Sequence, residues 1–262
     1  MRDYALITGA SSGIGFELAK IFAREKYNLF LTARNKTKLE ELQGEIRKSF
    51  DVDVLVIPKD LSLENSAREL YDEIKNKNVK IEILVNNAGF GGYGEFVKTN
   101  LESEVNMINL NVTSLVKLTK YFLQDMFLQK SGKILNVAST AAFQPGPLMA
   151  IYYATKSFVL SFSEAIAEEL EGSGITVTAL CPGPTESGFQ KTARITQSRL
   201  VKGRKLPSSK DVAEYGYKAL MKGRRVAVHG FINSLITKAI RFIPRKVITK
   251  VVHFIQKERD SI

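Results

Sequence analysis

Short apolar runs rich in β-branched residues alternate along the chain with longer stretches in which apolar residues recur at helical spacing. Ile14, Leu18 and Phe22, for example, fall on one face of a helix. Strands separated by helices indicate βαβ units with right-handed crossovers, and therefore one parallel sheet. The pattern predicts seven strands, at residues 4–8, 28–33, 52–57, 81–86, 132–138, 174–180 and 225–229.

These elements predict a single α/β domain over residues 1–262, in which a doubly wound, seven-stranded parallel sheet carries helices on both faces. No internal repeat and no Pro/Gly-rich linker divides the sequence. Residues 183–208 break the rhythm, because they open on prolines and then turn polar and basic. A long loop in a compact domain is typical of a lid over a bound ligand, so we interpret this segment as a lid.

Beyond the last strand, apolar residues follow helical spacing again over residues 231–258, with Pro244 as an interruption. Lysines and arginines are distributed around this stripe, which predicts a basic amphipathic C-terminal helical extension. The stripe consists of Ile232, Leu235, Ile236, Ala239, Ile240, Ile243, Val247, Ile248, Val251, Val252 and Ile255.

The extension also accounts for the net charge of +11. Residues 191–262 contain 18 Lys+Arg and 4 Asp+Glu, whereas residues 1–190 contain 20 and 23. The cations of the extension alternate with aliphatic residues that favour burial, so no nucleic-acid partner is expected. A basic amphipathic helix can lie on an anionic membrane surface, but we favour packing on its own domain or across a subunit interface.

Cysteine and histidine usage excludes other classes of protein. Cys181 is the only cysteine, so no internal disulfide can form, and a reducing, cytoplasmic location is expected. His229 and His253 are isolated, and no metal site is predicted. The sequence shows no cleavable signal pattern and no stretch of 18 apolar residues, so no membrane-spanning helix is expected.

A glycine-rich segment joins the first strand to the first helix. Glycines permit a tight turn and close approach of backbone N–H groups to a pyrophosphate, and the helix N-terminus adds partial positive charge. The position of this segment in the first βαβ unit predicts a dinucleotide site at Thr8, Gly9, Ser11, Ser12, Gly13, Ile14 and Gly15.

The second strand ends in Arg34 without a neighbouring carboxylate. In dinucleotide-binding folds an acidic residue here binds the ribose 2′-hydroxyl, whereas an arginine accommodates a 2′-phosphate. We therefore predict NADP(H) as the cofactor. Asp60, which follows the third strand, could accept a hydrogen bond from adenine or cap the next helix, and its position does not decide between the two.

Polar residues also follow the fourth and fifth strands, at Asn87 and Ser139. Tyr152 and Lys156 stand at i, i+4 near a helix start and share one face. A nearby ammonium lowers a tyrosine pKa from about 10, which makes Tyr152 a candidate general acid for a carbonyl oxygen that receives hydride. By itself, however, such a pair is usually a surface contact.

Taken together, these motifs resemble the short-chain dehydrogenase/reductase family. The resemblance covers residues 3–230 and implies a Rossmann-type fold with residues 1–190 as the cofactor-binding and catalytic core. It implies hydride transfer between NADP(H) and a carbonyl or secondary alcohol. The matching motifs, in order, are Thr8-Gly9-x-x-x-Gly13-Ile14-Gly15, Asn86-Asn87-Ala88-Gly89, Ser139, Tyr152-x-x-x-Lys156 and Pro182-Gly183.

The resemblance also implies individual roles. Tyr152 would be the acid/base, Lys156 would bind the nicotinamide ribose and lower the Tyr152 pKa, and Ser139 would polarise the substrate carbonyl. Asn111, which fits the family pattern better than Asn109, would hold a water in the proton relay. The other implied cofactor contacts are Arg34, Asp60, Leu61, Asn87, Ala88, Gly89, Pro182, Gly183 and Thr185.

The expected substrate wall is mostly apolar and predicts a small-molecule substrate that is a hydrophobic ketone or aldehyde. Besides Ser139 and Tyr152 it comprises Tyr93, Phe143, Met149 and Phe189. The alternative is a 3-oxoacyl reductase acting on carrier-protein or CoA thioesters, although the ending lacks the Val-Asp-Gly-Gly-like turn common in carrier-protein reductases. A non-catalytic NADP(H) sensor or a membrane-associated protein is less favoured, because the Ser/Tyr/Lys set is intact. We expect a homodimer or homotetramer.

Overall fold

The computed structural model describes residues 3–193, 195, 198, 201, 203 and 205–257. Seven strands form one sheet in which every neighbouring pair is parallel. Each overlaps a predicted strand, and no boundary differs by more than two residues, so the predicted sheet is confirmed. The strands are β1 (Tyr4–Thr8), β2 (Asn28–Thr32), β3 (Val54–Val56), β4 (Ile81–Asn86), β5 (Gly132–Val137), β6 (Ile175–Cys181) and β7 (Val226–Val228).

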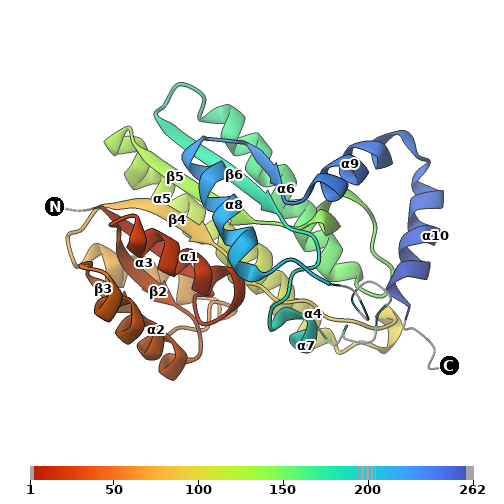
Figure 1. The fold of residues 1–262 in the computed structure, drawn as a ribbon, viewed down its shortest axis with the longest axis horizontal. Coiled ribbons are helices and arrows are strands. Elements are labelled where there is room, and N and C mark those ends of the chain that lie inside the picture. Colours follow the sequence, from red (N-terminus) through yellow and green to blue (C-terminus); the bar gives the residue numbers. More distant parts are fainter. Residues whose placement is uncertain are drawn as a thin grey trace.

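The strand order is β3-β2-β1-β4-β5-β6-β7, with the first strand near the middle of the sheet (Figure 1). The chain winds outward from β1 to β3 and then crosses back to β4 on the other side of β1. The winding direction therefore reverses between β1 and β4. In open α/β sheets the carboxyl ends of the strands at such a reversal form the crevice where ligands bind.

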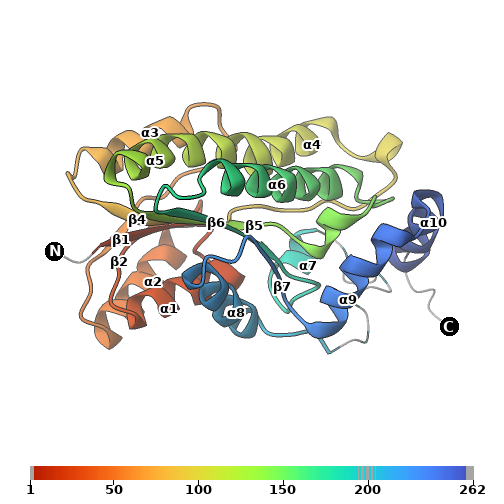
Figure 2. The same cartoon turned by 90° about the horizontal axis from the view of Figure 1, so that it is seen from above.

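Helices cover both faces of the sheet, as Figure 2 shows from the side. One face carries α1 (Gly13–Arg24), α2 (Lys36–Ser49) and α8 (Ser209–Met221). The other carries α3 (Ser66–Lys75), α4 (Leu101–Ile108), α5 (Leu115–Gln129) and α6 (Ala150–Glu169). This arrangement confirms the doubly wound, Rossmann-type fold.

Each layer of helices has its own apolar core. Ile7 of β1 packs with Phe22 of α1 on one face, whereas its neighbour Leu6 packs with Phe122 of α5 on the other. Successive side chains of a strand point to opposite faces. Because both faces of the sheet are covered, the strands read as nearly continuous apolar runs rather than as an alternating pattern.

The predicted C-terminal extension consists of α9 (Phe231–Ala239), a 3-10 turn (Ile240–Phe242) and α10 (Arg245–Gln256), and it projects from one end of the molecule (Figures 1 and 2). Ile248 and Val252 of α10 are buried in a cluster that contains Met149 and Tyr153. Packing on its own domain is therefore confirmed for this face of α10. Among the described residues, no helix is long and apolar enough to cross a membrane.

The predicted lid is only partly visible. It contains the short helix α7 (Phe189–Thr192), and residues 194, 196, 197, 199, 200, 202 and 204 of the segment lie outside the described residues. The same holds for residue 258 of the predicted extension. Phe189, Ile195 and Val201 of the lid segment line the cavity described below.

Candidate active site

A cavity of about 600 Å³ lies at the carboxyl edge of the sheet, lined by residues that follow strands β1 through β6. It extends from Arg34 through the glycine-rich segment to Ser139 and Tyr152. These residues span more than 100 positions of the sequence, and the parallel sheet brings them to one edge. The residues that line the cavity form both a region suited to a nucleotide and an apolar region.

The glycine-rich segment is fixed to β4 by Asn87. Its side-chain Nδ2 donates to the carbonyl oxygens of Thr8 (2.9 Å) and Gly9 (3.1 Å). The Thr8 hydroxyl in turn accepts from the backbone N of Asn87 (2.9 Å) and of Ala88 (3.0 Å). Thr8 and Gly15 thus stand behind the cavity wall and shape it, whereas Gly9, Ser11, Ser12, Gly13 and Ile14 line it.

Two features of this segment fit a phosphorylated ligand. Gly13 has φ +61°, a left-handed conformation that side-chain-bearing residues rarely adopt. Ser12 is the N-cap of α1, and its side chain makes no capping hydrogen bond. The first backbone N–H groups of α1 therefore remain available at the helix N-terminus, where the helix dipole favours an anion.

Beside β2 and β3 the cavity carries several charged groups. Arg34 Nη1 lies 3.9 Å from Asp60 Oδ2, and Lys38 and Lys59 also line the cavity. Asp60 Oδ1 accepts from the backbone N (3.0 Å) and the hydroxyl (2.7 Å) of Ser62. Asp60 therefore makes a local turn with Ser62 and does not cap α3, whose N-cap is Asn65, and Asp60 and Leu61 lie on the cavity wall.

The two lysines were not among the predicted site residues. Lys38 belongs to the first turn of α2, whose N-cap Asn35 accepts from the Lys38 backbone N (3.0 Å). Its proximity to Arg34 in the sequence is a signal that could have identified it. Lys59 is 17% exposed at its side chain and forms an ion pair with Glu69 (2.8 Å), so its position depends on tertiary contacts.

Ser139 and Tyr152 form the chemical end of the cavity. Ser139 follows β5 and accepts from the backbone N of Ala141 (3.1 Å) through its hydroxyl, which also contacts the Pro182 carbonyl oxygen (3.4 Å). Tyr152 comes from α6, and the Ser139 side chain lies close enough to the Tyr152 hydroxyl to lower its pKa. Two hydroxyl groups thus share one end of the cavity, beside Pro182, Gly183 and Thr185.

Lys156 lies one turn after Tyr152 and is 7% exposed. Its Nζ donates to the Val137 carbonyl oxygen (2.7 Å) and lies 5.9 Å from the centroid of the Tyr152 ring. Burial lowers the pKa of Lys156 to about 8. Burial raises the pKa of Tyr152 above its ordinary value, and the Ser139 hydrogen bond offsets this only in part. This structure does not show the expected depression of the Tyr152 pKa, because desolvation by burial is the largest influence on the phenol.

Asn111 lies in a six-residue π-helical turn, Asn109–Ser114, between α4 and α5. This turn packs against α6, the helix that carries Tyr152. Its Nδ2 donates to the Phe90 carbonyl oxygen (3.0 Å) and to Thr155 Oγ1 (3.1 Å), and its Oδ1 accepts from the Phe90 N (3.1 Å). The Thr155 hydroxyl donates to the Tyr152 carbonyl oxygen (2.8 Å). Asn111 thus connects the turn after β4 with the helix that carries Tyr152. π-helical turns of this kind are frequent at functional sites.

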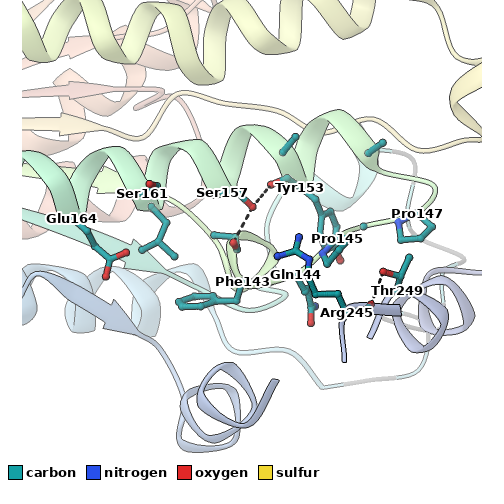
Figure 3. Close-up of a pocket in the computed structure, with 15 residues that line it drawn as sticks. Phe143, Gln144, Pro145, Pro147, Tyr153, Ser157, Ser161, Glu164, Arg245 and Thr249 are labelled. Carbon is teal, nitrogen blue, oxygen red and sulfur yellow. Dashed lines mark hydrogen bonds between the residues drawn. The ribbon is translucent and has the colours of Figure 1, made fainter. Parts of the chain in front are cut away.

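The structure places only some of the residues predicted for the substrate wall in the cavity. Met149 and Phe189 line the cavity, and the Phe189 ring centroid lies 5.2 Å from that of Tyr152. Phe143 instead lines a neighbouring pocket of about 710 Å³ between α6 and the start of α10 (Figure 3), which shares Gln144 and Tyr153 with the cavity. Tyr93 packs beside the apolar cluster, and its hydroxyl donates to the Gln256 carbonyl oxygen (3.0 Å).

Tyr153 and Gln256 are among the polar residues of the cavity wall that the sequence did not predict. Tyr153 follows Tyr152 directly but carries no motif of its own. Gln256 comes from the end of α10, and its side-chain amide donates to the Tyr153 hydroxyl. No local pattern distinguishes this glutamine from a solvated helix residue, since the contact joins segments 103 positions apart.

The family described as short chain dehydrogenase matches residues 3–198. This chain belongs to that family. Family membership makes it an oxidoreductase that acts on CH–OH or C=O groups, and it confirms the resemblance inferred from the motifs.

Among relatives of this short chain dehydrogenase, the very-long-chain 3-oxoacyl-CoA reductase of Rattus norvegicus is 32% identical over 254 residues, which covers 92% of this chain and 78% of the relative. A short-chain dehydrogenase from Sphingobium yanoikuyae, solved in complex with NADPH, is 29% identical with a TM-score of 0.82, covering 92% of this chain and 94% of the other. The bulky-bulky ketone specific alcohol dehydrogenase from Comamonas testosteroni is 30% identical with a TM-score of 0.79, covering 92% of each chain.

Proposed function

We propose that this short chain dehydrogenase is an NADP(H)-dependent reductase of bulky, hydrophobic ketones or aldehydes, with Tyr152 as the proton donor. The observation that carries the proposal is that Ser139, Tyr152 and the glycine-rich segment line one cavity. The apolar wall formed by Met149, Phe189 and Ile195 supports a hydrophobic substrate. The bulky-ketone specificity stated for the Comamonas testosteroni enzyme supports the same substrate class.

A nicotinamide, when bound, supplies the hydride for the carbonyl carbon. Tyr152 donates its phenolic proton to the carbonyl oxygen, and Ser139 holds that oxygen by a hydrogen bond. The Lys156 ammonium places positive charge near the phenolate that the proton transfer leaves, which lowers the energy of that state. Asn111 acts as a positioning residue, because it fixes α6 through Thr155.

The choice of NADP(H) is supported by charge at the β2 end of the cavity. Arg34 and Lys38 stand where a ribose 2′-phosphate is accommodated in this fold, and the NADPH bound by the Sphingobium yanoikuyae enzyme agrees with this choice. Guanidinium and ammonium groups both bind phosphate through charge-assisted hydrogen bonds. We expect kcat/KM to be higher with NADPH than with NADH.

A panel of carbonyl compounds, followed through NADPH and NADH oxidation, tests the whole proposal. The panel contains diaryl ketones, small ketones, aliphatic aldehydes and 3-oxoacyl-CoA thioesters of several chain lengths. We expect the diaryl ketones to be reduced with NADPH and the small ketones to be poor substrates. Faster turnover with NADH would refute the role of Arg34, and turnover confined to small polar ketones would refute the apolar substrate site.

The second candidate is a 3-oxoacyl-CoA reductase, and the rat relative favours it. A CoA thioester would have to extend its long pantetheine arm out of the cavity, whereas a bulky ketone is enclosed by the apolar wall. In the panel, a CoA thioester with a higher kcat/KM than every free ketone would establish this second function in place of the first.

The outer face of the extension supports a location at the surface of a membrane in the cytoplasm. Phe231 and Phe242 are 84% and 89% exposed, and Ile232 and Leu235 are exposed beside them. No Asp or Glu occurs between residues 226 and 257. Basic amphipathic helices with exposed phenylalanines bind anionic lipid surfaces. We therefore place the membrane surface, which the sequence alone did not favour, ahead of a subunit contact for this face. The cations of the extension are Lys238, Arg241, Arg245, Lys246, Lys250 and Lys257.

Assembly into a homodimer or homotetramer remains part of the proposal. It is supported by large apolar residues exposed away from the extension, Val105 on α4 and Phe127 and Leu128 at the far end of α5. Exposed apolar side chains of this size are frequent at subunit interfaces. Light scattering coupled to size-exclusion chromatography measures the mass directly, and a monomer at micromolar concentration would contradict this part.

A further inference from the structure

The inner face of α10 forms part of the cavity wall. Ile248, Val252 and Gln256 are spaced four residues apart, lie on one face of the helix and are all buried. Ile248 and Val252 belong to the apolar cluster around Met149 and Tyr153. Gln256 ends the row, is 1% exposed, and lines the same cavity as Ser139 and Tyr152.

Only one of the two polar atoms of the Gln256 side-chain amide makes a hydrogen bond. Its Nε2 donates to the Tyr153 hydroxyl, and its backbone carbonyl oxygen accepts from the Tyr93 hydroxyl (3.0 Å). Its Oε1 has no hydrogen-bond partner among the described residues. A buried amide oxygen without a partner costs free energy, so an acceptor kept in this state indicates that a ligand supplies the missing donor.

Tyr153 presents the complementary group. Burial raises the pKa of Tyr153 to about 12, so the side chain remains a neutral phenol at physiological pH. The phenolic oxygen accepts from Gln256, which leaves the O–H free to donate, and the described residues offer it no acceptor. One acceptor and one donor therefore stand side by side in the cavity that the apolar side chains of Met149, Phe189 and Ile195 also line.

We infer that Gln256 and Tyr153 form a second polar anchor of the substrate site, which binds a hydroxyl group that an otherwise hydrophobic ketone carries at a distance from its carbonyl. A hydroxyl can donate to Gln256 Oε1 and accept from Tyr153 at the same time, whereas a methyl group leaves both unpaired. The substrate class is thus a bulky hydroxyketone. This inference rests on the proposed ketone reductase activity and specifies its substrate.

The test compares ketones of matched size that differ only in a hydroxyl or methyl group. Two pairs vary its distance from the carbonyl: 4-hydroxybenzophenone with 4-methylbenzophenone, and 4-acetyl-4′-hydroxybiphenyl with 4-acetyl-4′-methylbiphenyl. In the wild type we expect kcat/KM to favour the hydroxyl compound of at least one pair by about tenfold or more, since sites built for a hydroxyl discriminate against analogues that lack it.

Gln256→Met and Tyr153→Phe should each remove this preference, mainly by raising KM for the hydroxyl ketone, while turnover of the methyl ketone is retained. Thr249→Val is the control on the same helix, because Thr249 lines the neighbouring pocket of Figure 3 but not the cavity, and it should keep the wild-type preference. A purely structural role would change both ketones of a pair equally. If one variant fails to fold, as judged by NADPH binding and thermal unfolding, the other carries the test.

The outcomes separate the two proposals. Failure to reduce any ketone would overturn the proposed function and the anchor with it. Reduction of the ketones without preference for either hydroxyl compound would overturn the anchor alone. A preference that survives both Gln256→Met and Tyr153→Phe would also overturn it, because the hydroxyl would then be bound elsewhere.

Discussion

Tyr152 and Lys156 lie one turn apart on α6, and burial moves their pKa values in opposite directions. Desolvation disfavours the charged form of each group, so it raises the pKa of the phenol and lowers that of the ammonium. At neutral pH both groups carry their protons. The site is therefore ready to donate a proton to an oxygen, which is the step that carbonyl reduction requires.

The first prediction concerns pH. Because the pKa of Lys156 is lowered to about 8, its ammonium is present below pH 8 and is lost as the pH rises through that value. We expect kcat/KM for ketone reduction to be flat between about pH 6 and 7.5 and to fall above pH 8, by up to about tenfold per unit. NADPH oxidation measured between pH 6 and 10 checks this. A rate that keeps rising to pH 10 would show that the charge on Lys156 is not needed.

Tyr152→Phe tests the proton donor directly. The substitution removes one hydroxyl and keeps the ring that contacts Phe189. We expect kcat to fall at least about 100-fold, because a positioned general acid contributes a factor of about 10² to 10⁴. NADPH affinity, measured by fluorescence titration, should stay within about twofold. Near-normal turnover in this variant would refute the assignment.

At the scale of elements, the segment between β1 and α1 depends on close packing against the turn after β4. A Cβ at Gly15 would come within 2.4 Å of Asn87 Nδ2 and 2.5 Å of the Gly9 carbonyl oxygen. By contrast, a Cβ at Gly44 in α2 would meet nothing within 4 Å. The two glycines therefore form a matched pair, one required by packing and one that only weakens a helix.

We expect Gly15→Ala to destabilise the protein by about 1–3 kcal/mol and to weaken NADPH binding, because overpacking forces the loop away from Asn87. Gly44→Ala should stabilise the protein by about 0.5–1 kcal/mol, since alanine is the better helix former, and should leave NADPH affinity unchanged. Urea unfolding and NADPH titration of both variants measure these effects. Equal NADPH affinity in the two variants would contradict the proposed role of the segment.

At the scale of the whole molecule, charge and exposed apolar surface are concentrated in the C-terminal extension. Its inner face closes the cavity through α10, whereas Phe231 and Phe242 are exposed, and its charged residues up to Lys257 are all cations. We expect the protein to float with vesicles that contain phosphatidylglycerol, not with pure phosphatidylcholine, and we expect salt to weaken this binding because screening reduces charge attraction.

The double variant Phe231→Ser with Phe242→Ser should lose this flotation and retain ketone reduction. Phe127→Ser is the matched control, because Phe127 is also exposed, at 60%, but lies on α5. If the control loses flotation to the same extent, or the double variant keeps it, the outer face of the extension is not the binding surface.

How far the sequence predicts this molecule depends on whether a feature is local. The βαβ rhythm, the glycine-rich segment and the Tyr152/Lys156 spacing are properties of short stretches, because periodicity and turn chemistry act between near neighbours. The parallel order of the strands follows from the same pattern, since right-handed crossovers leave few topologies. These features predicted the sheet within two residues at every strand end.

Other features depend on contacts between distant segments and could not be read locally. The π-helical turn at Asn111 exists because its side chain holds Phe90 and Thr155, which lie 21 positions before it and 44 after it. Lys59 and Gln256 reach the cavity only through the packing of α3 and α10. The pKa of Tyr152 follows burial, which the i, i+4 spacing does not encode.

The sequence by itself therefore determined the fold, the family pattern and the candidate chemical groups, because local physics specifies strands, helices and their turns. Only the tertiary structure decided which of these groups share a cavity, which charge states burial imposes on them, and which face of the basic extension is covered. Burial is a sum over contacts from the whole chain, so no stretch of sequence determines it alone.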